Sequence, residues 1–205
     1  MVDDSQDGYL IQELDPQILS TSFEIKTNWH VITGAPCSGK TTIIDLFAQR
    51  GYFTAHETAR EYFDKEMAKG RTSQEIRESG YTTQSGIFAM QRDLENSLEP
   101  GRVIFLDRGL PDTITFNRLF HLDLNGVLTA CFRYYYASVF ILDRLPFARD
   151  VKLGPEDEKP ARFIDEWLER DYSSLGYRVV RVPVYSPQER LQFILDQIPG
   201  SDKWT

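Results

Sequence analysis

Near the start of the chain, eight consecutive residues match the pattern G-x-x-x-x-G-K-[ST] in full: Gly34-Ala35-Pro36-Cys37-Ser38-Gly39-Lys40-Thr41. The apolar segment 29–33 before them predicts a strand, and the segment 40–50 after them predicts an amphipathic helix. A strand, a glycine-rich turn and a helix in that order surround an anion with backbone N–H groups and with the positive end of the helix dipole. The run therefore predicts a phosphate-binding loop (P-loop) within an α/β fold.

The P-loop motif also assigns roles to individual side chains. We expect Lys40 to contact the β- and γ-phosphates of a nucleoside triphosphate, Thr41 to offer its hydroxyl to Mg²⁺, and Thr42 to reach the α-phosphate. The sequence leaves both ATP and GTP open as the nucleotide. The residues expected to bind it are Gly34, Ala35, Pro36, Cys37, Ser38, Gly39, Lys40, Thr41 and Thr42.

The rest of the chain alternates between short apolar runs and longer helical patterns. Five predicted strands separated by helices favour a three-layer P-loop NTPase fold, with a central parallel sheet of about five strands and helices on both faces. The run 103–106 is apolar throughout, as expected of a strand that is buried on both faces. The predicted strands are 29–33, 52–56, 103–106, 139–142 and 178–182, and the predicted helices are 40–50, 58–69, 84–98, 160–175 and the segment that follows Ser186.

Length and charge narrow the class of protein. The 205 residues suit one domain, with 1–27 as an acidic lead-in that is either mobile or lies along the sheet edge, and 28–205 as a kinase-like nucleotide-binding domain. A formal net charge of −8 disfavours broad binding to nucleic acid. Two cysteines fit a reducing compartment, and no apolar run approaches the roughly 20 residues of a membrane span. We therefore expect a cytoplasmic protein without a membrane partner.

A carboxylate and an arginine follow the apolar run 103–106. Asp107 stands at the carboxyl end of a parallel strand, which faces the ligand crevice, so we expect it to support Mg²⁺ together with Thr41. Arg108 occupies the position where motor-type ATPases place a Glu that polarises water, and no Asn-Lys-x-Asp guanine signature occurs in the chain. This pair favours a kinase over a motor ATPase or a GTPase switch.

Other polar residues are candidates for the acceptor side of the site. Glu57 follows the predicted strand 52–56 and is expected to orient an acceptor group and take its proton. Arg60, one helical turn further on, is expected to pair with an anionic substrate group or with Glu57 itself. Gln91 and Arg92, on the predicted helix 84–98, are expected to line the acceptor pocket.

A polar stretch follows the predicted strand 139–142. In small kinases a segment at this place acts as a lid that excludes water and brings arginines to the moving phosphoryl group. Arg144 and Arg149 are the candidates for that role. The loop 183–186 before the last predicted helix is where such folds often hold the nucleotide base.

Several of these segments together resemble a family of AAA-labelled P-loop proteins. They are Gly34–Thr42, Glu57-Thr58-Ala59-Arg60-Glu61-Tyr62, Gln91, and Asp107-Arg108-Gly109 with Asp112. That family is close to the ribosylnicotinamide kinase module of a bacterial NAD regulator and, more distantly, to thymidylate kinase. The resemblance covers most of 28–198 and implies a nucleotide-dependent kinase, in whose sheet the third strand lies between the first and the second.

Two functions of different classes are compatible with these residues. The first is a small-molecule kinase that transfers the γ-phosphoryl group of ATP or GTP to a nucleoside, nucleotide or ribosylnicotinamide-like acceptor. The alternative is a nucleotide-binding regulatory or signalling module with slow NTPase turnover. A homodimer is left open. For the kinase, the expected catalytic residues are Lys40, Glu57, Asp107, Arg108, Arg144 and Arg149.

Overall fold

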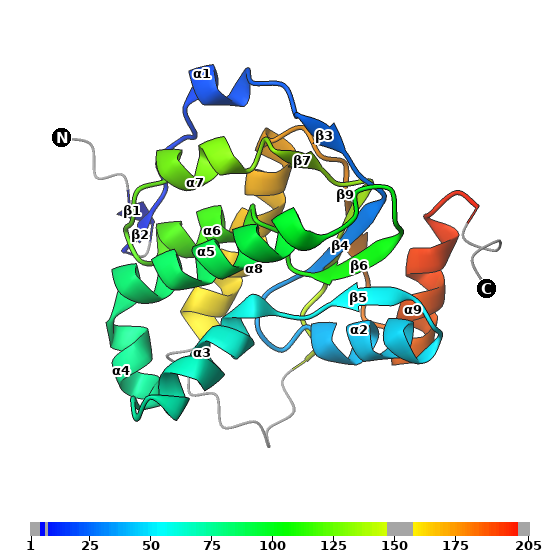
Figure 1. Cartoon of the computed structure of the whole chain (residues 1–205), viewed down its shortest axis with the longest axis horizontal. Coiled ribbons are helices and arrows are strands. Elements are labelled where there is room, and N and C mark those ends of the chain that lie inside the picture. The colour runs from blue at the N-terminus through cyan, green and yellow to red at the C-terminus, as the bar shows by residue number, and fades with distance from the viewer. Residues whose placement is uncertain (1–4, 7, 147–157, 201–205) are drawn as a thin grey trace.

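A parallel sheet of five strands forms the centre of the molecule, in the order β5-β6-β4-β8-β9 (Figure 1). The computed structural model describes residues 5, 6, 8–146 and 158–200. In chain order the third of these strands lies between the first and the second, so the predicted strand order is confirmed. The strands are β4 (Trp29–Thr33), β5 (Phe53–Ala55), β6 (Ile104–Asp107), β8 (Ser138–Leu142) and β9 (Val179–Val182).

Helices cover both faces of this sheet, as the sequence predicts. One face packs against α2 (Lys40–Gln49) and α9 (Pro187–Asp196), whose buried residues form a core cluster with Ile32, Phe105 and Phe140 of the strands. The other face packs against the remaining large helices. They are α5 (Gly80–Ser97), α6 (Asp112–Leu119), α7 (Asn125–Ala130) and α8 (Glu158–Ser174), with α3 (Thr58–Ala68) and α4 (Ser73–Glu78) at their edge.

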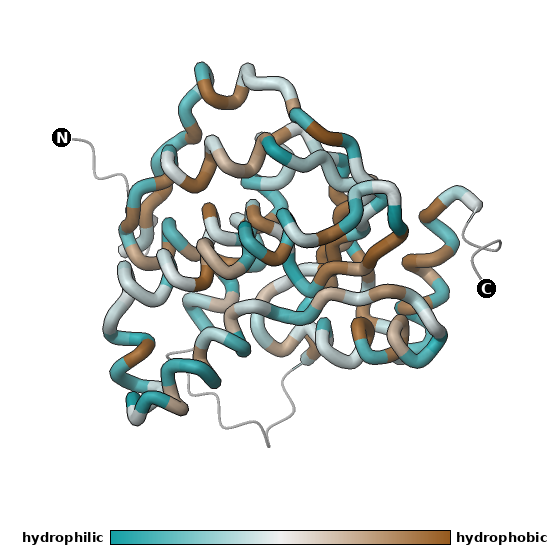
Figure 2. Tube along the Cα trace, in the orientation of Figure 1, coloured by the Kyte–Doolittle hydropathy of each residue, from teal (hydrophilic) through white to brown (hydrophobic). Residues whose placement is uncertain are grey.

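The central strands are apolar because both of their faces are covered. Every residue of β4 and β6 is buried, and Figure 2 shows hydrophobic residues running along the sheet. The parallel register pairs Ile32 of β4 with Asp107 of β6. The carboxyl ends of these two strands therefore meet at one edge, where the P-loop leaves β4 and Asp107 ends β6.

Residues 8–27 pack against the domain on the side of α6 and α7 (Figure 1). Leu14 is buried in the core cluster, and the carbonyl of Gln12 accepts a hydrogen bond from Arg118. A short parallel pair forms between β3 (Ile25–Lys26) and β7 (Tyr134–Tyr135), outside the main sheet. Two further strands and a single helical turn complete this part: β1 (Ser5–Gln6), β2 (Tyr9–Leu10) and α1 (Pro16–Leu19).

Some boundaries differ from the predicted ones. Helix α5 begins at Gly80, four residues before the predicted start at Gln84. The short helix α4, which is not among the predicted helices, begins with a capping box between Thr72 and Glu75. Within the described residues, no helix combines the length and apolarity needed to cross a membrane.

Candidate active site

The P-loop follows β4 and wraps the start of α2. Gly34 has φ +148°, and a Cβ there would lie 2.8 Å from the carbonyl oxygen of Leu142 and 2.8 Å from Ser38 Oγ, so only glycine fits. Gly39 has φ +86° and is the N-cap residue of α2. The loop thus has the left-handed backbone and close packing that allow its amides to line an anion site.

Lys40 lies inside this loop. Its Nζ donates to the carbonyls of Gly34 at 2.9 Å and Ala35 at 3.1 Å, and to Ser38 Oγ at 3.4 Å. Burial, together with the positive charge of Arg108, lowers the pKa of Lys40 to about 8. A buried ammonium that bonds only to neutral oxygens is well placed to bind the phosphates of a nucleotide.

Asp107 is buried at the end of β6. Burial raises its pKa to about 6, although the neighbouring charge of Arg108 acts in the opposite direction. Its Oδ1 atom is buried and has no hydrogen-bond partner within the described part of the chain. An unpaired buried carboxylate oxygen is costly, and a bound cation would remove that cost.

The donor chemistry around Asp107 fits Mg²⁺ shared with a nucleotide. Mg²⁺ is bound through one or two protein oxygens plus substrate phosphates, rather than by an all-protein cage. Across residues 5, 6, 8–146 and 158–200, no cluster of three or more His, Cys, Asp or Glu side chains could hold a metal ion alone. The carboxylate of Asp107 and the hydroxyl of Thr41 are the protein oxygens that the sequence assigns to this ion.

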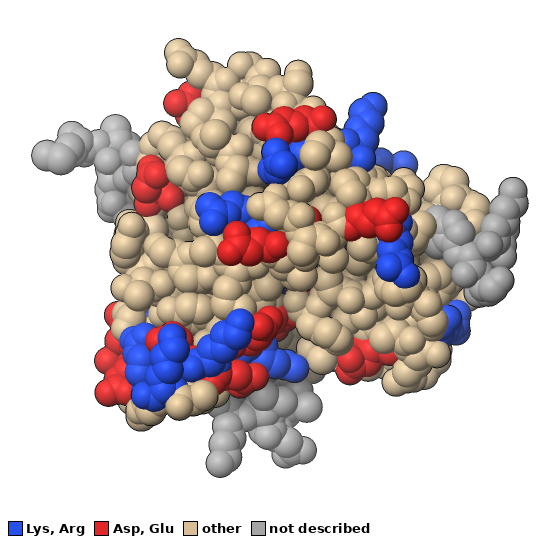
Figure 3. Space-filling model, in the orientation of Figure 1, with Lys and Arg blue, Asp and Glu red and all other residues tan. Residues whose placement is uncertain are grey.

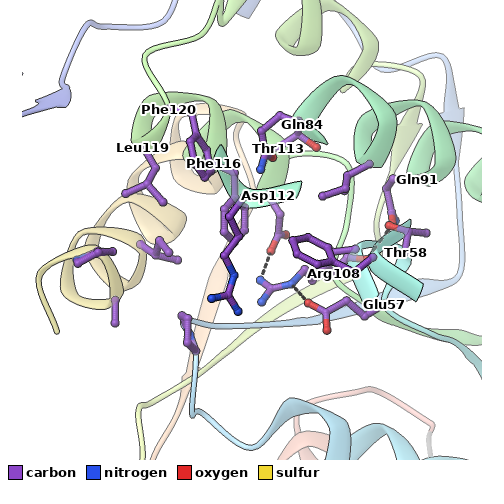
Figure 4. Close-up of a pocket in the computed structure, with 18 of the residues that line it drawn as sticks. Glu57, Thr58, Gln84, Gln91, Arg108, Asp112, Thr113, Phe116, Leu119 and Phe120 are labelled. Atoms are coloured by element: carbon purple, nitrogen blue, oxygen red, sulfur yellow. Dashed lines mark hydrogen bonds and ion pairs between the residues drawn. The ribbon is translucent and has the colours of Figure 1, made fainter. Parts of the chain in front are cut away.

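Glu57 and Arg108 meet just beyond the carboxyl ends of the paired strands β5 and β6 (Figure 4). Arg108 Nε donates to Glu57 Oε1 at 2.7 Å. Although Glu57 is the N-cap residue of α3, its side chain makes no capping bond, because it is turned toward Arg108 instead. Burial alone would raise the pKa of Glu57, but the charge and hydrogen bond of Arg108, with Lys40, hold it below its usual range. Glu57 is therefore ionised at neutral pH.

Asp112 fixes Arg108 from the other side. Arg108 Nη1 donates to Asp112 Oδ1 at 3.0 Å, and the hydroxyls of Thr33 and Tyr172 donate to the same carboxylate at 2.5 Å and 2.7 Å. Arg108 has φ +74°, a left-handed conformation that costs a non-glycine residue about 1–3 kcal/mol. Arg108 thus bonds directly to Glu57, to Asp112 and to the carbonyl of Gly34. Thr33 and Tyr172 act through Asp112, and together these contacts hold a strained residue in one orientation.

A cavity of about 620 Å³ opens beside this cluster. Pro36 of the P-loop, Glu57, Arg108 and Asp112 border its polar end. Figure 4 shows Leu119 and Phe120 farther from that end, whereas the ring centre of Phe116 lies 5.3 Å from the guanidinium carbon of Arg108. A volume of this order suits a small organic metabolite. The other lining residues are Thr58, Ala59, Phe63, Arg77, Gln84, Ile87, Gln91, Gly109, Thr113, Arg144, Pro160, Ala161 and Ile164.

The residues predicted for the acceptor side have different positions. Gln91 lines the cavity, where its amide accepts from Thr58 Oγ1 at 2.8 Å and donates to Glu95 at 2.9 Å. Arg60 is exposed and is absent from the cavity lining. Arg92 contacts Asp93 and borders a separate recess of about 130 Å³. Successive helix residues point in different directions, and on α5 it is Gln91 that faces the cavity while Arg92 faces the recess.

Of the two lid candidates, Arg144 borders the cavity and pairs with Glu158 through bonds of 2.8 Å and 2.7 Å. Arg149 lies outside the described residues. Sequence reasoning did not single out Arg190 or Thr33, and it named Asp112 only within the family resemblance. Their contacts join segments far apart in the chain, so no local pattern marks them.

Charges on the visible face of the molecule are mixed in sign. In Figure 3, Lys and Arg gather with Asp and Glu over α3 and α4, where Lys65 pairs with Glu61 and Lys69 with Glu66. Such exposed pairs contribute little to stability.

Comparison with models of known protein families identifies the family of this chain. Residues 29–190 match the family described as AAA domain. The chain belongs to this family. A comparison with curated proteins finds no significant match.

Solved structures share the fold of this AAA-domain protein at low identity. The NadR protein in complex with NR has a TM-score of 0.60 at 17% identity and covers 83% of this chain, which spans 51% of NadR. Thymidylate kinase from Ehrlichia chaffeensis has a TM-score of 0.59 at 14% identity, covering 82% of this chain and 96% of its own. Deoxyadenosine kinase from M. mycoides, with dCMP and dCDP bound, has 0.55 at 17%, covering 82% and 97%.

Proposed function

We propose that this AAA-domain protein is a phosphotransferase that moves the γ-phosphoryl group of ATP or GTP to a small-molecule acceptor. The cavity beside the P-loop carries the proposal, because it places a metabolite-sized volume between Pro36 of the loop and the ionised Glu57. A simple NTPase needs only a water molecule at that point, whereas a kinase needs room for an acceptor.

The proposed reaction uses the residues at the polar end of the cavity. The acceptor oxygen attacks the γ-phosphorus while the bond from that phosphorus to the β–γ bridging oxygen breaks, and the nucleoside diphosphate leaves. Glu57 Oε1 is bonded to Arg108, so the other carboxylate oxygen is the one offered to the acceptor proton. Lys40 and Arg108 balance the negative charge of the transferring group.

Mg²⁺ would be held by Thr41 and Asp107 and would neutralise charge on the β- and γ-phosphate oxygens. Arg144, beside the cavity, is the described candidate for the lid role. The aromatic side of the cavity suits an acceptor with a ring, and the neighbours in complex with NR and with dCMP favour a nucleoside, nucleotide or ribosylnicotinamide-like compound.

A phosphate-transfer screen tests the proposal. MgATP and MgGTP, labelled on the γ-phosphate, are incubated with nucleosides, nucleotides and ribosylnicotinamide-like compounds, and labelled product is separated. We expect one acceptor class to be labelled, Lys40→Met to abolish labelling, and the surface control Lys65→Met to leave it unchanged. Slow hydrolysis that no acceptor stimulates would favour the regulatory module instead.

A further inference from the structure

Arg190 on α9 is almost fully buried, with 2% of its surface exposed, and it bonds three separate segments. Its Nη1 donates to the carbonyl of Ser38 in the P-loop at 2.6 Å. Its Nη2 donates to the carbonyl of Asp143 at 2.8 Å, and its Nε to the carbonyl of Pro183 at 2.8 Å. Asp143 follows β8 and Pro183 follows β9, so one side chain joins the P-loop to the two loops that flank it.

The bond to Ser38 determines the orientation of a P-loop amide. The carbonyl of Ser38 and the N–H of Gly39 belong to one planar trans peptide unit and point in opposite directions. Because Arg190 draws the carbonyl toward α9, the N–H of Gly39 points away from Arg190. A bond of 3.2 Å from Leu145 N to the carbonyl of Cys37 orients the preceding peptide in the same way.

The charge of Arg190 adds to this effect. All of its described hydrogen bonds go to neutral carbonyls, and burial lowers the pKa of its guanidinium from the ordinary value. No ion pair found among residues 5, 6, 8–146 and 158–200 includes it. The nearby charge of Asp143 acts in the opposite direction to burial, but no carboxylate bonds to this guanidinium within the described residues, so it adds positive potential beside the P-loop.

We propose that Arg190 is a positioning residue of the nucleotide site: it presets the Ser38–Gly39 peptide and favours the polyphosphate part of a nucleoside di- or triphosphate. The proposal rests on the nucleotide binding in the proposed function. It differs from a purely structural role in one measurable respect. Loss of Arg190 should weaken the binding of a nucleotide more strongly when its phosphate chain is longer. A general loss of packing would weaken the binding of all nucleotides alike.

Titration calorimetry with MgATP, MgADP and AMP tests this prediction on the full chain. We expect Arg190→Met to weaken the affinity for MgATP and MgADP by about tenfold or more, and the affinity for AMP by less than about threefold. Arg190→Lys keeps the charge but loses the fork of donors, so it should weaken MgATP by about threefold. Arg181 provides matched controls, since it lies on β9, is 30% exposed and pairs with Asp143 and Asp165. Arg181→Met and Arg181→Lys should leave the ATP-to-AMP ratio unchanged.

The outcomes separate this inference from the proposed function. A wild-type chain that binds no MgATP or MgGTP overturns the proposed function itself. If the wild-type chain binds MgATP and Arg190→Met lowers the affinities for MgATP and AMP equally, or lowers neither, only the role of Arg190 is overturned. If Arg190→Met does not fold, Arg190→Lys decides: binding of MgATP equal to that of the wild type would refute the positioning role.

Discussion

Two arginines with little exposure bind carboxylates in the described part of the chain, Arg118 fully buried and Arg108 partly buried, but their surroundings differ. Arg118 on α6 donates through Nη2 to Asp171 Oδ1 and through Nε to both carboxylate oxygens, and Oδ2 also accepts from Thr115 at 2.8 Å. Arg108 at the candidate site divides its bonds among Glu57, Asp112 and the carbonyl of Gly34. Beside it, one oxygen of Asp107 is unbonded within the described residues.

The completed pair serves the scaffold. Arg118 also binds the carbonyl of Gln12 and lies 4.2 Å from the ring centre of Trp167, so it ties the N-terminal segment to α6 and α8. The site cluster instead keeps Lys40 and Asp107 with shifted pKa values of about 8 and about 6. The comparison teaches that buried charge with every bond made marks structure, whereas buried charge with an open bond marks a binding site.

The largest expected effect is on catalysis. Glu57→Gln should lower kcat for phosphoryl transfer by about 10²- to 10⁴-fold, because the amide cannot take the acceptor proton. The amide oxygen can still accept from Arg108, so we expect the melting temperature to change little. Steady-state kinetics with the acceptor found by screening measure the first effect, and calorimetry the second. A kcat within threefold of the wild type would exclude Glu57 as the base.

Breaking the scaffold pair should have the largest effect on stability. Asp171→Ala leaves the buried guanidinium of Arg118 without its carboxylate and should cost about 3–5 kcal/mol in the free energy of unfolding. Urea denaturation measures the loss. Nucleotide affinity of the folded fraction should stay unchanged, since the pair lies apart from the P-loop. The division between the two regions fails if Asp171→Ala is as stable as the wild type.

Removing the carboxylate of Asp107, by contrast, should stabilise the fold. The pKa of Asp107 lies above its ordinary value of 3.8, so its ionised form destabilises the fold. That penalty is absent below pH 4, grows as the pH rises and is complete above about pH 6. Asp107→Asn should therefore raise the free energy of unfolding by about 1–3 kcal/mol at pH 8, with no gain at pH 4.

The same variant should lose the contribution of Mg²⁺ to ATP affinity, which titration with and without EDTA measures. Asp107→Asn proteins less stable than the wild type at pH 8 would show that the carboxylate has a structural partner after all.

The smallest effects come from a matched pair of threonines. Thr115→Val and Thr33→Val each remove one hydroxyl that donates to a buried aspartate, and each should cost about 0.5–1.5 kcal/mol of stability. Only Thr33→Val should also lower kcat, because Asp112 orients Arg108. Paired denaturation and kinetic measurements compare them, and equal kcat values would mean that Asp112 needs no help from Thr33.

Much of the architecture follows from local patterns. The P-loop motif, the apolar run before Asp107 and the alternation of strands with helices predicted the sheet and its covered faces, while the strand order followed from the family resemblance. Each of these features is written in a short stretch of residues with a fixed period. Helix α4 could have been found in the same way, from the Thr72 and Glu75 capping box.

Contacts between distant segments could not be predicted. Thr33 meets Asp112, Arg118 meets Gln12, and Arg190 meets Ser38, and the partners in each pair come from different elements. Periodicity gives the face of a helix but not what that face contacts. Of the two residues expected at the acceptor pocket, Gln91 lines the cavity and Arg92 does not. The packing of the N-terminal lead-in beside α6 and α7 depends on such distant contacts as well.

The bond between Arg190 and the P-loop spans 152 positions of the chain. Ribosomes add about 5–20 residues per second, so the motif emerges about eight to thirty seconds before the side chain that braces it. The nascent first half holds the signature of a nucleotide site but not its finished shape. A product cut short before the last helix would keep the motif and lose the brace, so detecting the motif in a fragment says little about whether that fragment retains ligand.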